Sequence, residues 1–224
     1  MTERSQASGP LPSRPLSAIE FVLGAAIVLG HNVWRVVPNE VVFLFFAALI
    51  SVRLREGGFA ALGFVWPRSW TVIIVIAMAA AALRILAGEI VEPWAAQYWP
   101  PVVAPSGAEN IRGNPSVALY WLGLVWTFAA IGEETVYRVY LTKRAADIDG
   151  GGWFAWAMAT ILVSVLFGFG HFYKGLAGII DSAVAGLIFG TAYLAAGRVL
   201  WAPILAHGLV DTIGVAALYF GLAD

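Results

Sequence analysis

The chain has 224 residues, of which 60% are hydrophobic and 12% are charged, and its formal net charge is −1. Soluble globular domains contain about 25% charged residues, and the mean hydropathy here is +0.81, so the composition excludes an ordinary soluble domain. The small net charge gives no reason to expect a nucleic-acid partner. The sequence contains no cysteine, which excludes disulfides, thiolate nucleophiles and cysteine-bound metals.

Apolar segments follow one another along the whole chain, and several reach the length of about 20 residues that a helix needs to cross a bilayer. We therefore predict an all-α, polytopic membrane protein with about seven transmembrane helices and an active-site core in the last four. The long connection 87–115 either contains a short eighth helix or forms an interfacial loop with aromatic anchors. The seven predicted spans are 17–36, 39–52, 69–86, 116–145, 152–171, 175–196 and 200–222.

Basic residues near the ends of these spans predict the orientation. One side carries Arg4, Arg14, Arg53, Arg55, Arg68, Lys143, Arg144 and Arg198, and the other carries Arg35, Arg84, Arg112 and Lys174. Cytoplasmic loops are enriched in lysine and arginine, so the first set is expected in the cytoplasm and the second outside. The protein is then a multi-pass protein of the cell (inner) membrane with a cytoplasmic N-terminus. Residues 1–16, polar and rich in Pro and Ser, are predicted to form a disordered cytoplasmic tail.

The segment Gly132–Arg138 places two adjacent carboxylates and a guanidinium in the fourth predicted span. A charged side chain at the centre of a membrane helix costs about 2.5–3.5 kcal/mol on insertion scales, so this cluster requires an explanation. Glu134 and Arg138 are four residues apart, which favours an ion pair on one helix face. Glu133 points about 100° away and needs a partner from another helix, which makes it a candidate general base.

Two of the three histidines also lie at membrane depth. His171 ends the fifth predicted span, and His207 lies four residues before Asp211 in the seventh. Glu133 precedes Gly150 by 17 residues and His171 follows it by 21, so an antiparallel hairpin would hold both within about 6 Å of one level. His207 reaches that level only if the charged tip of this hairpin projects beyond the start of the seventh span.

Other polar and small residues in the spans have structural interpretations. We interpret His31, near the end of the first span, as an interfacial or helix-packing histidine. Asp181, early in the sixth span, is expected to form a structural hydrogen bond. Gly186 and Gly190 form a GxxxG pair, which favours close helix contact.

Three motifs together resemble one known family. The sequences EETVYR (133–138), FGFGH (167–171) and HGLVD (207–211) are similar to the EExxxR, FxxxH and HxxxN/D motifs of the CPBP intramembrane proteases. That family includes the type II CAAX prenyl endopeptidases and the bacteriocin-processing, Abi-like proteins. The resemblance covers residues 116–214, so we assign 17–115 to N-terminal transmembrane helices with an interfacial loop and 116–224 to a catalytic core.

The resemblance implies a role for each matched residue. Glu133 would be the general base that activates water, assisted by His171. Glu134 and Arg138 would brace the site and orient its neighbours, and Phe167 would have a structural or orienting role. His207 and Asp211 would lie where the family stabilises the oxyanion of the tetrahedral intermediate.

The last motif position departs from the prenyl endopeptidases, which carry asparagine where this chain has Asp211. An amide can donate a hydrogen bond to an oxyanion, whereas an ionised carboxylate cannot. Asp211 must then be protonated, orient His207 as the donor, or bind a metal. The metalloprotease alternative would use Zn²⁺, because two histidines and a carboxylate form a common catalytic zinc site. Its candidate ligands are Glu133, His171, His207 and Asp211.

The motifs therefore predict an intramembrane endopeptidase that acts on a membrane-embedded or lipidated substrate in the lipid bilayer. The first alternative is a non-catalytic membrane scaffold or a bacteriocin-immunity-type binding protein, in which the polar cluster is only structural. The second is an ion-coupled transporter, which also places carboxylates and histidines in mid-membrane. Transporters favour internal repeats with polar sites in both halves, whereas here the polar residues lie in the second half.

Overall fold

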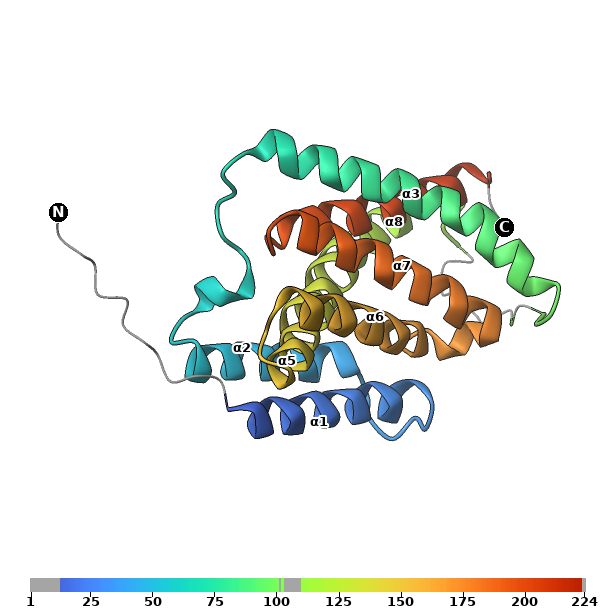
Figure 1. Ribbon diagram of the computed structural model, residues 1–224. Helices are drawn as coiled ribbons and strands as arrows, with labels where there is room; N and C mark the ends of the chain where they lie inside the picture. Colours follow the sequence, from blue (N-terminus) through green and yellow to red (C-terminus); the bar gives the residue numbers. More distant parts are fainter. Residues whose placement is uncertain (1–12, 101, 103–109, 223–224) are drawn as a thin grey trace.

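Seven long helices and no strand make up the part of the chain that the computed structural model describes, which is residues 13–100, 102 and 110–222 (Figure 1). Short helical turns η1 (Phe59–Leu62) and η4 (Phe172–Lys174) join some of them. The prediction of an all-α protein with about seven helices is confirmed. The seven are α1 (Arg14–Asn32), α2 (Glu40–Arg55), α3 (Trp70–Ala96), the continuous segment Pro115–Ile148, α6 (Trp153–Phe169), α7 (Gly175–Ala195) and α8 (Trp201–Phe220).

Length and composition allow five of these helices to cross a membrane, namely α1, α3, Pro115–Ile148, Phe172–Ala195 and α8. The apolar α6 is slightly shorter, at 17 residues, and α2 has 16. Large hydrophobic side chains are exposed on the outside of the bundle, for example Leu54 at 78%, Leu119 at 68% and Trp153 at 83%. In water such a surface would be unfavourable, whereas in a bilayer it faces lipid. The protein is therefore a multi-pass membrane protein.

Two predicted boundaries are wrong. Helix α1 begins at Arg14, so residues 14–16 are helical and do not belong to a disordered tail; Pro15 fits the first turn because no intrahelical partner exists there for an N–H. Residues 1–12 lie outside the described part. Helix α3 continues past Leu86 to Ala96 through Pro93. The described residues between α3 and α4 contain no further helix, and 101 and 103–109 lie outside the description.

Polar residues at the helix ends explain why the helices begin where they do. Asn39, Ser69 and Asn114 each accept a hydrogen bond from the backbone N–H three residues later, at the starts of α2, α3 and α4 (Pro115–Leu124). Such N-caps satisfy a donor that the helix itself cannot. Between α5 (Thr142–Ile148) and α6, Gly150 and Gly151 have φ of 80° and 72°, which glycine adopts without strain.

The segment Pro115–Ile148 passes between two groups of helices (Figure 1). Helices α6, α7, α8 and α3 lie on one side of it, and the α1–α2 hairpin lies on the other. Helix α7 packs closely on α6 through the predicted glycine pair. A Cβ on Gly186 would lie 3.1 Å from the Ser164 backbone, and one on Gly190 would lie 2.5 Å from Thr160 Cγ2.

One of the charged residues near the tip of the α5–α6 hairpin lies inside the bundle. Arg144, which we counted among the charges flanking the spans, is fully buried. Its guanidinium pairs with Glu20 of α1 at 2.7 Å, with Glu56 at 2.8 Å and with Asp147 at 3.2 Å. This network binds the α1–α2 hairpin to the core at the end of the bundle remote from His171.

Candidate active site

The helix that carries the acidic motif is unusually wide. Residues Val125–Glu133 (η2) and Thr135–Leu141 (η3) form π-helical turns on either side of Glu134. Such i→i+5 segments are rare and frequently occur at functional sites. The prediction assumed a regular α-helix, yet its main consequence holds. Glu134 is fully buried in the bundle, whereas Glu133 lines a cavity.

Both carboxylate oxygens of Glu134 contact Arg138 on the same helix. Its Oε2 lies 2.9 Å from Arg138 Nε, and its Oε1 accepts a hydrogen bond from Arg138 Nη2 at 3.1 Å. The ion pair expected from the four-residue spacing is present. The guanidinium also lies over the ring of Phe167, 4.8 Å from its centroid. Since Arg138 is only 1% exposed, the pair compensates a charge that would otherwise be very costly in the interior.

His207 of α8 is held on three sides. Its Nδ1 lies 2.8 Å from Glu134 Oε1, and its Nε2 lies 3.4 Å from Asp211 Oδ2. The ring stacks on Phe189 at 4.8 Å between centroids. The sequence indicated the His207–Asp211 pair, but it did not indicate that Glu134 reaches across to the same imidazole.

His171 follows α6, and its tautomer can be deduced from its partner. Nδ1 lies 3.0 Å from the carbonyl oxygen of Phe167. Because a carbonyl can only accept, Nδ1 carries the hydrogen, and in the neutral ring Nε2 is then an acceptor. The ring also packs against Phe167, 4.9 Å between centroids. Phe167 therefore contacts both Arg138 and His171.

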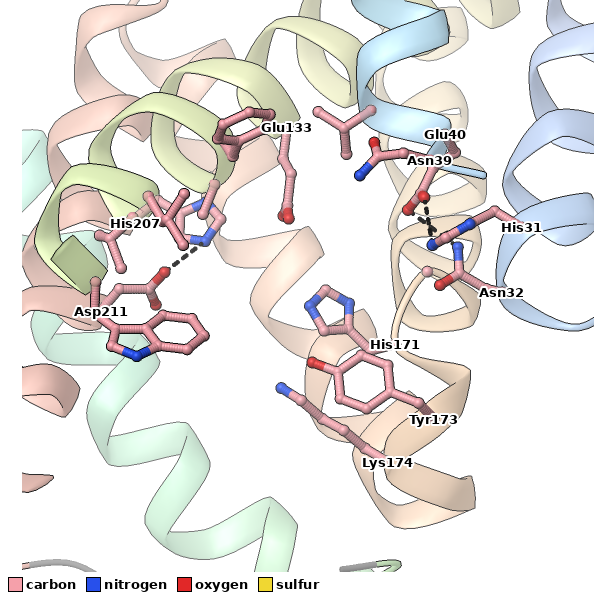
Figure 2. A pocket seen from close by; sticks show the side chains of 17 residues that line it. His31, Asn32, Asn39, Glu40, Glu133, His171, Tyr173, Lys174, His207 and Asp211 are labelled. Carbon is pink, nitrogen blue, oxygen red and sulfur yellow. Dashed lines mark hydrogen bonds and ion pairs between the residues drawn. The ribbon is translucent and has the colours of Figure 1, made fainter. Parts of the chain in front are cut away.

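All four residues of the predicted centre line one cavity of about 640 Å³, namely Glu133, His171, His207 and Asp211. Figure 2 shows Glu133 projecting between His207 and Asp211 on one side and Asn39 and Glu40 on the other. Among the described residues, the buried Oε2 of Glu133 has no hydrogen-bond partner. Glu133 and His171 thus face each other across the cavity and are not in direct contact. The cavity between them leaves space for a water molecule.

The side chains do not form a ready metal site. Within the described residues, no three histidine or acidic side chains are grouped closely enough to hold a metal ion. Both ring nitrogens of His207 face carboxylates, so neither is free to be a ligand in this arrangement. A zinc ligand must present a free lone pair to the metal, and the present geometry therefore does not fit Zn²⁺.

One wall of the cavity consists of residues that sequence reasoning did not place in the site, namely His31, Asn32, Asn39 and Glu40 of the α1–α2 hairpin. His31 is thus not only a packing histidine: Nδ1 faces the Val37 carbonyl at 2.7 Å, and Nε2 lies 3.2 Å from Glu40. Glu40 could have been found from sequence, because it is an acidic residue at the edge of an apolar span. Tyr173 and Lys174 also line the cavity, and sequence reasoning did not place them in the site.

Asp181 lies away from this cavity. Its carboxylate pairs with Arg84 of α3, so this ion pair links α7 to α3. The structural interpretation of Asp181 agrees with this contact. Arg84, which we counted among the charges flanking the spans, is likewise engaged inside the bundle.

The fold and the site define a class of protein: a polytopic helical membrane protein with a carboxylate–histidine centre in a cavity between its helices. Residues 115–213 match the family model described as type II CAAX prenyl endopeptidase Rce1-like. This match shows that residues 115–213 are similar to the Rce1-like segment of that family. The resemblance seen in the three motifs is thereby confirmed. Comparisons with curated proteins and with solved structures found no match.

Proposed function

We propose that this protein is an endopeptidase that hydrolyses a peptide bond of a membrane-associated substrate inside the cavity, with Glu133 as general base. The observation that carries the proposal is the free carboxylate oxygen of Glu133, which is buried and faces the same cavity as His171. A general base needs space for water within hydrogen-bond reach of its acceptor atom. Glu134, by contrast, is occupied by Arg138 and His207.

The chemistry follows from these positions. A water molecule between Glu133 and His171 would donate one proton toward the Glu133 carboxylate and its other hydrogen to His171 Nε2. Its oxygen adds to the scissile carbonyl carbon, and the carbonyl oxygen becomes an oxyanion. The carbon–nitrogen bond then breaks, and the proton held by Glu133 passes to the leaving amine. The products are one new carboxyl terminus and one new amino terminus.

His207 is the residue that we propose for stabilising the oxyanion, with Asp211 as its positioning partner. Of the three roles open to Asp211, the distance of 3.4 Å between its Oδ2 and His207 Nε2 supports the orienting role. Because both ring nitrogens of His207 face carboxylates, which can only accept, both carry hydrogens. The positive charge of this ring lies at the cavity lining, where it would stabilise developing negative charge. The aspartate then replaces the family's asparagine by acting through His207 and does not need to donate itself.

The substrate class follows from the location of the site among apolar helices. The cavity lies between helices whose outer faces are apolar, so peptides that are embedded in the bilayer or carry a lipid would reach it most readily. We propose that class as the substrate. No step in this mechanism uses a metal ion.

The test is a comparison of membrane-protein termini between cells that contain the intact protein and cells that contain Glu133→Gln. The glutamine keeps the shape of the side chain and removes the base, so the variant should insert and fold but generate no new termini. Glu89→Gln is the matched control, because Glu89 is an exposed carboxylate of α3 that does not line the cavity. New termini that persist in the Glu133→Gln cells would disprove the mechanism.

We also propose an inner-membrane location with the N-terminus in the cytoplasm, on the basis of the basic residues at the span ends. In that orientation the cavity, bordered by Asn32 and Lys174, lies toward the non-cytoplasmic face. Reporter domains that fluoresce only in the cytoplasm, fused in turn to each terminus, test this. Fluorescence of the N-terminal fusion alone is expected, and the opposite result would reverse the orientation.

A further inference from the structure

The cavity wall formed by the α1–α2 hairpin lies outside the segment that matches the family, which begins at residue 115. This wall carries a small polar network. The buried carboxylate of Glu40 is held by Asn32, which donates to its Oε1 at 3.0 Å, and by His31, whose Nε2 lies 3.2 Å from its Oε2. Polar groups at membrane depth are costly and commonly functional, yet no step of the proposed hydrolysis uses this network.

Asn39 presents a hydrogen-bond donor to the cavity. Its Oδ1 accepts from the backbone N–H of Val42 at 3.0 Å, where it caps α2. This bond fixes which end of the amide is oxygen, so Nδ2 must point the other way. Figure 2 shows that nitrogen directed into the cavity. It has no partner among the described residues.

Asn32 presents an acceptor to the same cavity. Its Nδ2 donates to the Val28 carbonyl at 3.1 Å and to Glu40 Oε1 at 3.0 Å. Both partners are acceptors, so the amide cannot be reversed, and Oδ1 is the free atom. Figure 2 shows this oxygen on the cavity side of the hairpin. The described residues include no donor bonded to it.

We propose that Asn39 Nδ2 and Asn32 Oδ1 form a binding site for the backbone of an extended peptide, which they hold across the cavity from Glu133. An extended chain offers carbonyl acceptors and N–H donors along its length, and its groups would pair with one fixed donor and one fixed acceptor. Glu40 and His31 act as positioning residues, because they lock the Asn32 amide. The site would therefore bind the main chain of the peptide and accept different side chains.

This assignment rests on the proposed function only in naming the peptide as the substrate. Binding can be measured without cleavage, so the experiment uses the purified Glu133→Gln protein in lipid nanodiscs. The probe is a fluorescein-labelled decapeptide of alternating valine and alanine, since β-branched residues favour the extended conformation. Its Kd is measured by fluorescence anisotropy, beside that of the same peptide N-methylated along its central residues.

Two variants of Asn39 separate peptide binding from helix capping. Asn39→Asp and Asn39→Ser both keep an oxygen that can cap α2, but they remove the Nδ2 donor. Each should raise the Kd about 2- to 12-fold, the effect of one hydrogen bond. Asn114→Asp is the matched control, because Asn114 caps α4 in the same way and does not line the cavity. Its Kd should be unchanged.

The N-methylated peptide tests the acceptor on Asn32. It lacks central N–H groups and should bind the Glu133→Gln protein about 2- to 12-fold more weakly than the unmodified peptide. The proposal is overturned if the unmodified peptide does not bind, if both Asn39 variants bind as tightly as their parent, or if Asn114→Asp weakens binding equally. Peptide binding with these differences, together with no cleavage by the intact protein, would refute the proposed hydrolysis and leave this site standing.

Discussion

His207 Nδ1 lies 2.8 Å from Glu134 Oε1, and the other oxygen of the same carboxylate lies 2.9 Å from Arg138 Nε. One fully buried carboxylate thus holds a guanidinium of its own helix and an imidazole of α8. The second residue of the acidic motif is therefore more than a self-neutralising brace. It sets the position of the histidine that we propose for the oxyanion, while Glu133 beside it stays free to act on water.

Removal of the Arg138 charge should strongly destabilise the protein. In Arg138→Met the carboxylate of Glu134 would remain buried without its ion-pair partner. Removal of one partner of a buried ion pair costs about 3–5 kcal/mol of folding stability. Thermal unfolding of the purified protein in detergent measures the loss.

The double variant Glu134→Gln, Arg138→Met provides the control for this prediction. It removes both charges and keeps an oxygen that accepts from His207 Nδ1. Replacement of a complete buried pair is often close to neutral, so the double variant should recover most of the stability. A double variant as unstable as Arg138→Met would show that the ion pair is not the source of the loss.

The contact between α6 and α7 should be sensitive to a single methyl group. A Cβ on Gly190 would lie 2.5 Å from Thr160 Cγ2, so Gly190→Ala forces the two helices apart and should cost about 1–3 kcal/mol. Gly123→Ala is the comparison, because a Cβ there meets nothing within 4 Å. This variant should be neutral or slightly stabilising, since alanine favours helix over glycine. Equal stability of the two variants would contradict the close α6–α7 contact.

Removal of divalent metal ions should leave peptide hydrolysis unchanged. Both ring nitrogens of His207 face carboxylates, and the proposed mechanism assigns the activation of water to Glu133 and His171. The rate of cleavage is measured in nanodiscs before and after dialysis against EDTA, and again after addition of Zn²⁺. Loss of activity with EDTA and its return with zinc would instead support the metalloprotease alternative.

Much of the site could be predicted from the local spacing of residues in the sequence. The four-residue intervals between Glu134 and Arg138 and between His207 and Asp211 predict contacts within one helix, because such residues share a face. The apolar runs likewise determine the helices and their membrane location, since about 20 apolar residues are needed to cross a bilayer. The glycine pair in α7 indicated a close helix contact for a similar local reason.

Only the tertiary structure decided which helices face one another. The contact of Glu134 with His207, the buried position of Arg144 and the wall formed by Asn32 and Asn39 all join residues distant in sequence. Periodicity states which side of a helix is buried, but it carries no information about the neighbour on that side. The sequence by itself therefore identified carboxylates and histidines that line the cavity. The packing of the α1–α2 hairpin against them decided the shape of the cavity and what it can hold.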